Sequence, residues 1–266
     1  MATVIAVFAI IFYILSSFRQ YQTIADQGAR NRKQVIMLGS VAVLLHGVAW
    51  FSQLSTHNGI NFSFFNVGSL ISLVIGIMIL LSSFKKPLEN LFLGVFPMAA
   101  ILIFINLLVD TSDQARMITD HGLAAHIILS IMAYSILTIA GFQAVLLMVQ
   151  DHQLKHKHMS GIIKILPPLQ TMNRLLFEIL RAGTLLLTLA IVSGFVFLDD
   201  LFAQHLAHKT VFTLLAWLTF ALLQLGHWRF GWRGNVASKW TLVGTGLLIL
   251  AYFGSKLVLE IILGNG

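Results

Sequence analysis

The sequence predicts an all-α, polytopic integral membrane protein with eight transmembrane helices and both termini on the outer, periplasmic side. Of its 266 residues, 58% are hydrophobic and only 10% are charged, and the mean hydropathy is +0.87. These values lie far from the average of soluble proteins. The apolar residues fall into eight runs that are each long enough to cross a bilayer, so we expect residues 1–266 to form a single membrane domain.

The eight predicted spans show no internal repeat. The first lacks a basic n-region and an A-x-A cleavage site, so we expect an uncleaved anchor. The third carries a ridge of small residues, Gly68, Ser72 and Gly76, which allows another helix to approach closely. The longest connection, before the sixth span, contains Pro167-Pro168. In order, the spans cover residues 2–18, 34–54, 63–84, 88–109, 121–150, 175–198, 209–226 and 237–263.

Lysine and arginine concentrate in alternate loops. Four such loops hold 4, 2, 4 and 3 of them, whereas the remaining loops contain Arg116 and, at a helix edge, Lys209. By the positive-inside rule the basic loops are cytoplasmic and both termini face out. In chain order the residues of the basic loops are Arg19, Arg30, Arg32 and Lys33; Lys85 and Lys86; Lys155, Lys157, Lys164 and Arg174; and Arg229, Arg233 and Lys239.

Composition and the lack of catalytic motifs exclude several functions. The chain contains no cysteine, which excludes disulfides, thiolate haem ligation, iron–sulfur clusters and CxxC redox chemistry. The formal charge of +7 resides in loops between apolar runs, so it indicates membrane orientation and not nucleic-acid binding. No acid/base pair, nucleophile–His arrangement, phosphate loop or pair of intramembrane carboxylates is present. We therefore expect a carrier or accessory protein in contact with membrane lipid, and not an enzyme.

The fifth predicted span, His121 to Gln150, carries a polar stripe on one face. His126, Ser130, Tyr134 and Thr138 follow one another at i+4 spacing, which stacks them turn over turn. Polar groups inside hydrocarbon are costly unless they face other helices, water or a cofactor. His126, in the outer half of this span, is therefore the first candidate functional residue.

A second intramembrane histidine, His46, lies at a depth compatible with that of His126. Histidine is a common metal ligand and a usual axial ligand of haem iron. Two helices can clamp a non-covalently held haem b between two such imidazoles, with Trp50 and Tyr134 lining the slot. The alternative is that each histidine is a structural hydrogen-bonding group between helices.

Other polar residues give weaker signals. Glu178 and Arg181, three residues apart near the start of the sixth span, are expected to pair with each other. The cluster from His152 to His158 lies among lysines that repel cations, which favours a solvated loop over a metal site. His227 lies at the cytoplasmic end of the seventh span. Three further histidines are predicted at the outer rim: His121, His205 and His208.

Two stretches carry a resemblance to a known family. HIILSIMAYSIL in the fifth span resembles the H-x-x-x-S-x-x-x-Y stretch of the cytochrome c assembly family, the CcsA/CcmC/HemX-like integral membrane haem handlers. KTVFTLLAWL and GHWRFGWRGNVASKWTLVGTGLLILAYFGSK are similar to the C-terminal part of that family. With FFNVGSLISL and LPPL, the pattern is closest to the family's YpjD branch. The resemblance implies a multi-pass protein of the bacterial inner membrane, involved in haem handling or cytochrome c assembly.

The resemblance assigns roles at only a few positions. His126 matches the family histidine that ligates haem at the outer face, and His227, just before GWRG, matches one that serves a site towards the cytoplasm. Lys209 and Trp217 match the end of the family's tryptophan-rich segment and the helix after it. Arg233, within GWRG, is expected to pair with a haem propionate, an inference from its charge and position.

The sequence also departs from the family's pattern. The WGxxWxWD haem-handling segment is absent, and VFLDDLFAQHLAHK stands in its place. A second outer histidine beyond YFG is missing, so we expect His46 to supply the second ligand, with the three outer-rim histidines as alternatives. The leading hypothesis is haem binding through His126. A second hypothesis is a non-haem accessory or regulatory subunit of a membrane transporter, whose partner is another inner-membrane protein.

Overall fold

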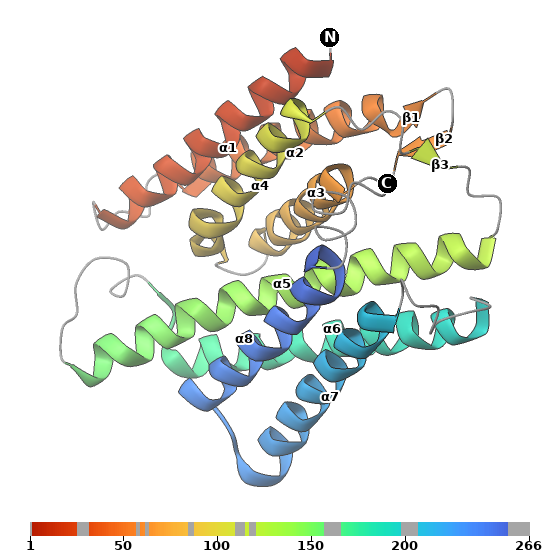
Figure 1. The fold of residues 1–266 in the computed structure, drawn as a ribbon. Coiled ribbons are helices and arrows are strands. Elements are labelled where there is room, and N and C mark those ends of the chain that lie inside the picture. The colour runs from red at the N-terminus through yellow and green to blue at the C-terminus, as the bar shows by residue number, and fades with distance from the viewer. Residues whose placement is uncertain are drawn as a thin grey trace. The chain divides into compact units, whose positions relative to one another are not determined.

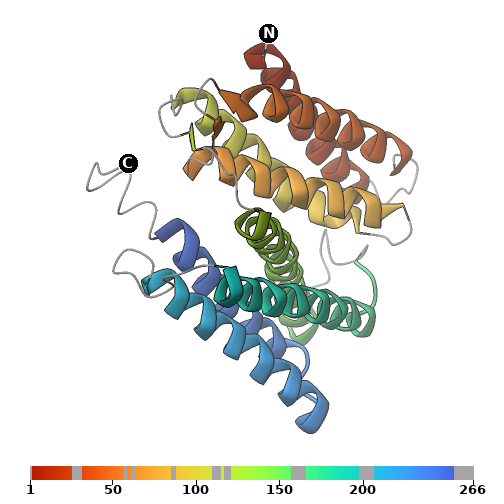
Figure 2. The ribbon, with the colours of Figure 1, turned by 90° about the vertical axis from the view of Figure 1, so that its right-hand side faces the viewer.

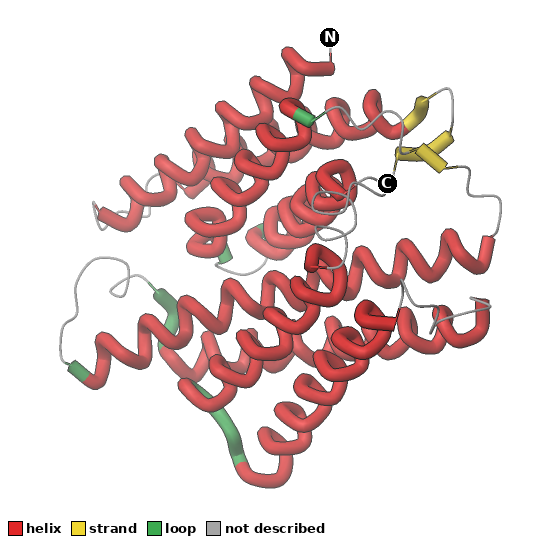
Figure 3. The backbone as a smooth tube through the Cα atoms, viewed as in Figure 1, coloured by secondary structure: helices red, strands yellow, loops and turns green. Residues whose placement is uncertain are grey.

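A computed structural model describes the chain as an array of helices (Figure 3). The described residues fall into two compact units, one of residues 1–117 with 159–167 and one of residues 118–158 with 168–266. A single membrane domain over residues 1–266 stays a prediction. The described residues are 2–25, 32–56, 59–61, 64–84, 88–109, 115–116, 121–156, 166–197 and 207–254.

The first unit is built on four long helices. Helix α1 packs against α2 and α4, and α3 packs against the same two helices, so each helix has two neighbours (Figures 1 and 2). The bounds in chain order are α1 (Ala2–Ala25), α2 (Arg32–Leu54), α3 (Phe64–Ser83), the 3-10 turn η2 (Glu89–Leu91) and α4 (Phe92–Leu108).

Aromatic rings fill the centre of this unit. Tyr13 of α1 and Phe96 of α4 are fully buried, and their ring centroids lie 4.9 Å apart. Phe92 stacks on Phe96 one turn away, at 4.1 Å. Gly39 of α2 lies against the edge of the Phe96 ring, where a Cβ would approach the ring to 2.9 Å. Burial of these large rings accounts for much of the packing of α1, α2 and α4.

A small antiparallel sheet joins two loops at one end of this unit. Strand β2 (Gly59–Asn61) lies between β1 (Ser55–Thr56) and β3 (Ala115–Arg116), with Ser55 opposite Ile60 and Ile60 opposite Arg116. The prediction of loops between the helices therefore missed these short strands. The loop after α2 and the loop after α4 meet at one end of the unit, as they must if successive helices alternate in direction.

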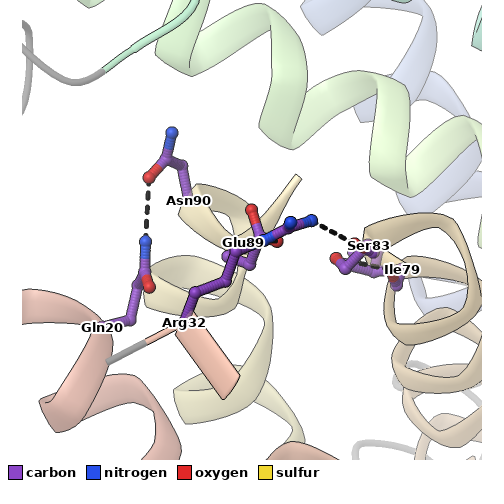
Figure 4. Close-up of polar contacts among 6 residues, drawn as sticks. All are labelled: Gln20, Arg32, Ile79, Ser83, Glu89 and Asn90. Carbon is purple, nitrogen blue, oxygen red and sulfur yellow. Dashed lines mark hydrogen bonds and ion pairs between the residues drawn. The ribbon is translucent and has the colours of Figure 1, made fainter. Parts of the chain in front are cut away.

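Polar contacts join the other two loops of this unit (Figure 4). Arg32, at the start of α2, forms an ion pair with the buried Glu89 and donates a second hydrogen bond of 2.7 Å to the carbonyl oxygen of Ser83. Gln20 of α1 donates to the side chain of Asn90 at 2.9 Å. These contacts join the α1–α2 and α3–α4 connections, both of which are predicted to be cytoplasmic. The two connections therefore lie at the same end of this unit, and the side of the membrane that this end faces stays a prediction.

The second unit is also built on four helices, in which α5 packs against α6 and α8, and α7 against the same two (Figure 1). Pro168 accepts hydrogen bonds from the amides of Thr171 and Met172, so this proline stands at the start of α6, where its missing N–H costs nothing. The elements are α5 (His121–Lys155), α6 (Leu169–Phe197), α7 (Ala207–Phe230), α8 (Asn235–Ile249) and the π-helical turn η5 (Leu250–Gly254).

Seven of the described helices are long and apolar enough to cross a membrane: α1, α2, α3, α4 with η2, α5, α6 and α7. The predicted eighth span coincides with α8 and η5 as far as Gly254, and its remainder lies outside the described residues. Eight spans and outer termini stay predictions. Helix α5 continues past Gln150 to Lys155, whose ammonium pairs with Asp151 at 2.7 Å.

Candidate functional site

His126, the first candidate ligand, lies half-buried one turn into α5 and faces α6. Its Nδ1 lies 3.0 Å from the carbonyl oxygen of Ala190 and 3.1 Å from Oγ of Ser193. The Ser193 hydroxyl itself donates to the Ala190 carbonyl at 2.8 Å, so its oxygen is left to accept. On α6, Nδ1 of His126 therefore faces two oxygen atoms, the Ala190 carbonyl and the Ser193 hydroxyl, and both accept hydrogen bonds from it.

This contact fixes the proton of the His126 ring. A carbonyl oxygen can only accept, so Nδ1 carries the hydrogen and the neutral ring has its lone pair on Nε2. Within the described part of the chain, Nε2 of His126 has no hydrogen-bond partner. Histidines that ligate metals in proteins show the same arrangement, in which one nitrogen donates to a carbonyl and the other binds the metal. This arrangement leaves the Nε2 lone pair of His126 available to accept a hydrogen bond or to bind a metal ion.

The lower part of the polar stripe contacts α7 and η5. The Tyr134 hydroxyl lies 3.5 Å from Oγ1 of Thr213, and its ring centroid lies 6.0 Å from that of Tyr252. The Nζ atom of Lys209 lies 5.4 Å from the centroid of the Tyr252 ring, which is a cation–π distance. Thr138 instead donates back to the Tyr134 carbonyl within α5 at 2.8 Å. Below His126, Tyr134 therefore serves contacts between helices, whereas Thr138 bonds within its own helix.

His227, the second candidate ligand, lies in the last turn of α7. Its ring stacks on Phe177 of α6, with centroids 3.6 Å apart and an interplanar angle of 17°. Nδ1 donates to the carbonyl oxygen of Trp232 at 2.7 Å, which again leaves the lone pair on Nε2. The two candidate ligands of the second unit thus share the same proton arrangement.

The GHWRFGWRG segment holds His227 in this position. Gly231 has φ of +67° and its amide donates to the carbonyl of His227, which closes α7 with a left-handed residue. The chain then folds back, so that the Trp232 ring covers Gly226 and a Cβ at that glycine would overlap the ring. Trp232 also stacks near Trp240 of α8 at 5.5 Å. The glycines of this segment are therefore required by the turn that positions His227.

His46, the predicted partner of His126, has a different environment. It is fully buried in the first unit, where Nδ1 lies 3.2 Å from the Tyr13 hydroxyl and Nε2 lies 2.9 Å from Oγ of Ser69. A hydroxyl can donate or accept, so both ring nitrogens are satisfied in either tautomer. His46 links α1, α2 and α3. This geometry favours the structural interpretation of His46.

The structure does not bring all predicted site residues together. His46 and Trp50 belong to the first unit and His126 to the second, so their pairing stays a prediction. Trp50 donates through Nε1 to the carbonyl of Asn66 at 3.2 Å. Arg233 is exposed in the α7–α8 turn, and its pairing with a propionate also stays a prediction. In the described ranges, no group of three or more His, Cys, Asp or Glu is placed to hold a metal ion.

The polar contacts between α6 and α7 were not predicted from the sequence, although the family resemblance singled out Trp217 itself. Trp217 donates to Oγ1 of Thr188 at 2.9 Å, and Gln224 donates to Oγ1 of Thr184 at 2.8 Å. With the His227–Phe177 stack, these contacts form a row along the two helices. The sequence contained one signal for this row: Phe177, Thr184 and Thr188 lie seven and eleven residues apart, so they share one face of α6.

Comparison with known families identifies the class of protein. The family model described as "Cytochrome C assembly protein" matches residues 34–263. This range includes His46, His126 and His227, and it covers part of the first unit and most of the second. The chain therefore belongs to the cytochrome c assembly protein family.

Curated relatives agree with this assignment. The chain is 31% identical to the inner membrane protein YpjD of Escherichia coli K12, over 97% of this chain and 99% of the relative, and equally to its counterpart in E. coli O157:H7. It is 30% identical to a 28.8 kDa protein of Azospirillum brasilense over 52% of each chain. No solved structure matches. Together with its apolar helices, these relatives make the chain a multi-pass inner-membrane protein, as the sequence predicted.

Proposed function

We propose that this protein binds b-type haem non-covalently, with His126 as an axial ligand, and acts in haem handling or cytochrome c-type assembly. The observation that carries the proposal is the hydrogen bond from Nδ1 of His126 to the Ala190 carbonyl, which leaves the lone pair on Nε2. Membership of the cytochrome c assembly family supports the role. The protein would act as a carrier, not a catalyst.

The residues of the second unit fit such a group. An imidazole whose Nδ1–H is held by a carbonyl is fixed in orientation and is a more basic ligand at Nε2. Ser193 strengthens the hold, because its hydroxyl oxygen accepts from the same N–H. Haem, when bound, supplies the iron, its redox chemistry and two carboxylates. His227 has the same proton arrangement and stands as a candidate for a second site on the opposite, cytoplasmic side.

The second ligand to the His126 haem is proposed among the histidines of the second unit. His46 would have to give up its hydrogen bond to Tyr13 or Ser69 in order to bind iron. In the second unit, His121 and His208 are exposed at the starts of α5 and α7. His205 lies outside the described residues. The ligand set favoured here is His126 with a histidine of its own unit.

A reduced-minus-oxidised absorption spectrum of purified protein supplied with haem tests the proposal. We expect a Soret band with sharp reduced α and β bands, and their loss in His126→Ala. His152→Ala is the matched control, since His152 is an exposed histidine of α5 far along the chain from the site, and it should keep the full spectrum. A preparation that stays colourless with added haem would contradict the proposal.

The second candidate function is that of a non-haem accessory or regulatory subunit of a membrane transporter. The observation that favours it is the absence of tryptophan from VFLDDLFAQHLAHK, where the family resemblance leads one to expect WGxxWxWD. Co-purification of a stoichiometric inner-membrane partner with colourless protein would support this function. The same spectrum therefore separates the two candidates.

A further inference from the structure

The turn between α7 and α8 exposes two large aromatic side chains. Trp228 and Phe230, at the end of α7, are 79% and 73% exposed. The turn itself is ordered by the left-handed Gly231 and by the amide of Gly234, which donates to Asn173 of α6 at 3.0 Å. The exposed rings therefore project from a closed, well-packed turn.

Three basic side chains in and near this turn have no partner among the described residues. Arg229, Arg233 and Lys239 are all exposed, and none forms an ion pair or a side-chain hydrogen bond among the described residues. Residues 207–254 contain no Asp or Glu at all. Arg32 and Arg174, by contrast, each pair with a glutamate. The positive charge of this turn is not neutralised by its own helices.

The position of the turn in the membrane indicates what neutralises its positive charge. The apolar span of α7 runs from His208 to Phe230, so the aromatic and basic residues stand at its end. Aromatic rings at a span end lie at the headgroup level of a bilayer. Basic residues there are attracted to anionic lipids of the cytoplasmic leaflet, the side on which this turn is predicted to lie.

We propose that Trp228, Arg229, Phe230, Arg233 and Lys239, the α7–α8 turn patch, bind the headgroup of an anionic phospholipid. The guanidinium groups of Arg229 and Arg233 suit bidentate contact with a phosphate, and the ammonium of Lys239 adds a point charge. The two exposed rings lie among the upper acyl chains and glycerol groups. This inference is independent of haem binding and concerns the haem-free protein.

Native mass spectrometry of haem-free protein in detergent, with equal amounts of phosphatidylglycerol and phosphatidylcholine, tests the proposal. We expect the protein to retain phosphatidylglycerol in preference by about fivefold or more, as one basic residue at the surface already contributes about that factor. The triple variant Arg229→Gln, Arg233→Gln, Lys239→Gln should bring the ratio close to one. Each single variant should lower the ratio of phosphatidylglycerol to phosphatidylcholine by a few-fold. The single variants therefore test the proposal even if the triple variant does not fold.

The matched control removes the same charge elsewhere on the predicted cytoplasmic side. The variant Arg19→Gln, Lys33→Gln, Lys155→Gln changes the formal charge from +7 to +4, like the first triple variant, through exposed residues outside the patch. It should keep the preference. Equal loss in both triple variants would overturn the proposal in favour of general charge attraction. Displacement of the lipid by added haem in the wild type, but not in Arg233→Gln, would overturn it in favour of a propionate site.

Discussion

His46 and His126 are both histidines within apolar helices, yet the two units give them opposite hydrogen-bond environments. In the first unit, His46 lies between two hydroxyls, of Tyr13 and Ser69, which satisfy both ring nitrogens. In the second, His126 meets a carbonyl and a hydroxyl on the same nitrogen. Depth in the membrane therefore does not decide the role of a histidine. In our proposal, the kind of group that faces each ring nitrogen distinguishes a structural histidine such as His46 from a haem ligand such as His126.

The largest expected effect is that alanine variants of the two histidines lose different properties, haem binding in one and stability in the other. His126→Ala should lose nearly all bound haem, while its haem-free form should unfold close to the haem-free wild type. His46→Ala should keep its haem but lower the free energy of unfolding by about 1–3 kcal/mol, because two interhelical hydrogen bonds are lost and two hydroxyls stay buried. Haem content per protein and thermal unfolding of the same preparations measure both effects. Loss of haem in His46→Ala with normal stability would break the comparison and support the His46–His126 pair.

A smaller effect is expected at the groups that support each ring. Ser193→Ala removes an acceptor from Nδ1 of His126, and we expect about tenfold weaker haem binding, as is usual for groups that orient a metal ligand. Ser69→Ala removes the corresponding hydroxyl from His46 and should leave haem affinity unchanged. Haem titration followed in the Soret band gives both affinities. Equal loss of haem affinity in Ser193→Ala and Ser69→Ala would contradict the different roles proposed for His126 and His46.

The smallest effect concerns the turn that positions His227. Gly226→Ala places a methyl group against the Trp232 ring, so we expect a loss of about 1–3 kcal/mol of stability through overpacking. Gly246→Ala is the matched control in the neighbouring helix α8, because a Cβ there meets nothing within 4 Å. Urea or thermal unfolding compares the two. Identical stability would show that the Trp232 contact does not hold the turn.

The sequence predicted the helices well because the bilayer imposes their length and apolar character. It did not predict the extension of α5 to Lys155, since hydropathy carries no signal for a helix that continues past the apolar region. The i+4 pair of Asp151 and Lys155 supports that extension. The short strand pairing of Ile60 with Arg116 joins loops 56 residues apart along the chain, which no local pattern reveals.

Side-chain partners were predicted less well than residue types. Glu178 was expected to pair with Arg181, but it pairs with Arg174 at 2.9 Å, while Arg181 donates to the Phe177 carbonyl. Residues three and four apart on a helix are nearly equal neighbours, so the choice depends on rotamers that the sequence does not fix. His126 and His227 were identified from residue type, position and family resemblance. Their acceptors are backbone carbonyls of Ala190 and Trp232, for which sequence gives no signal.

The most direct test of the central claim is a redox titration of haem in His126→Met and His46→Met. A methionine in place of an axial histidine raises the midpoint potential of haem iron, so the change reports ligation itself and not stability. The account predicts a higher potential, or loss of the low-spin spectrum, in His126→Met and an unchanged potential in His46→Met. A raised potential in His46→Met with an unchanged one in His126→Met would contradict it.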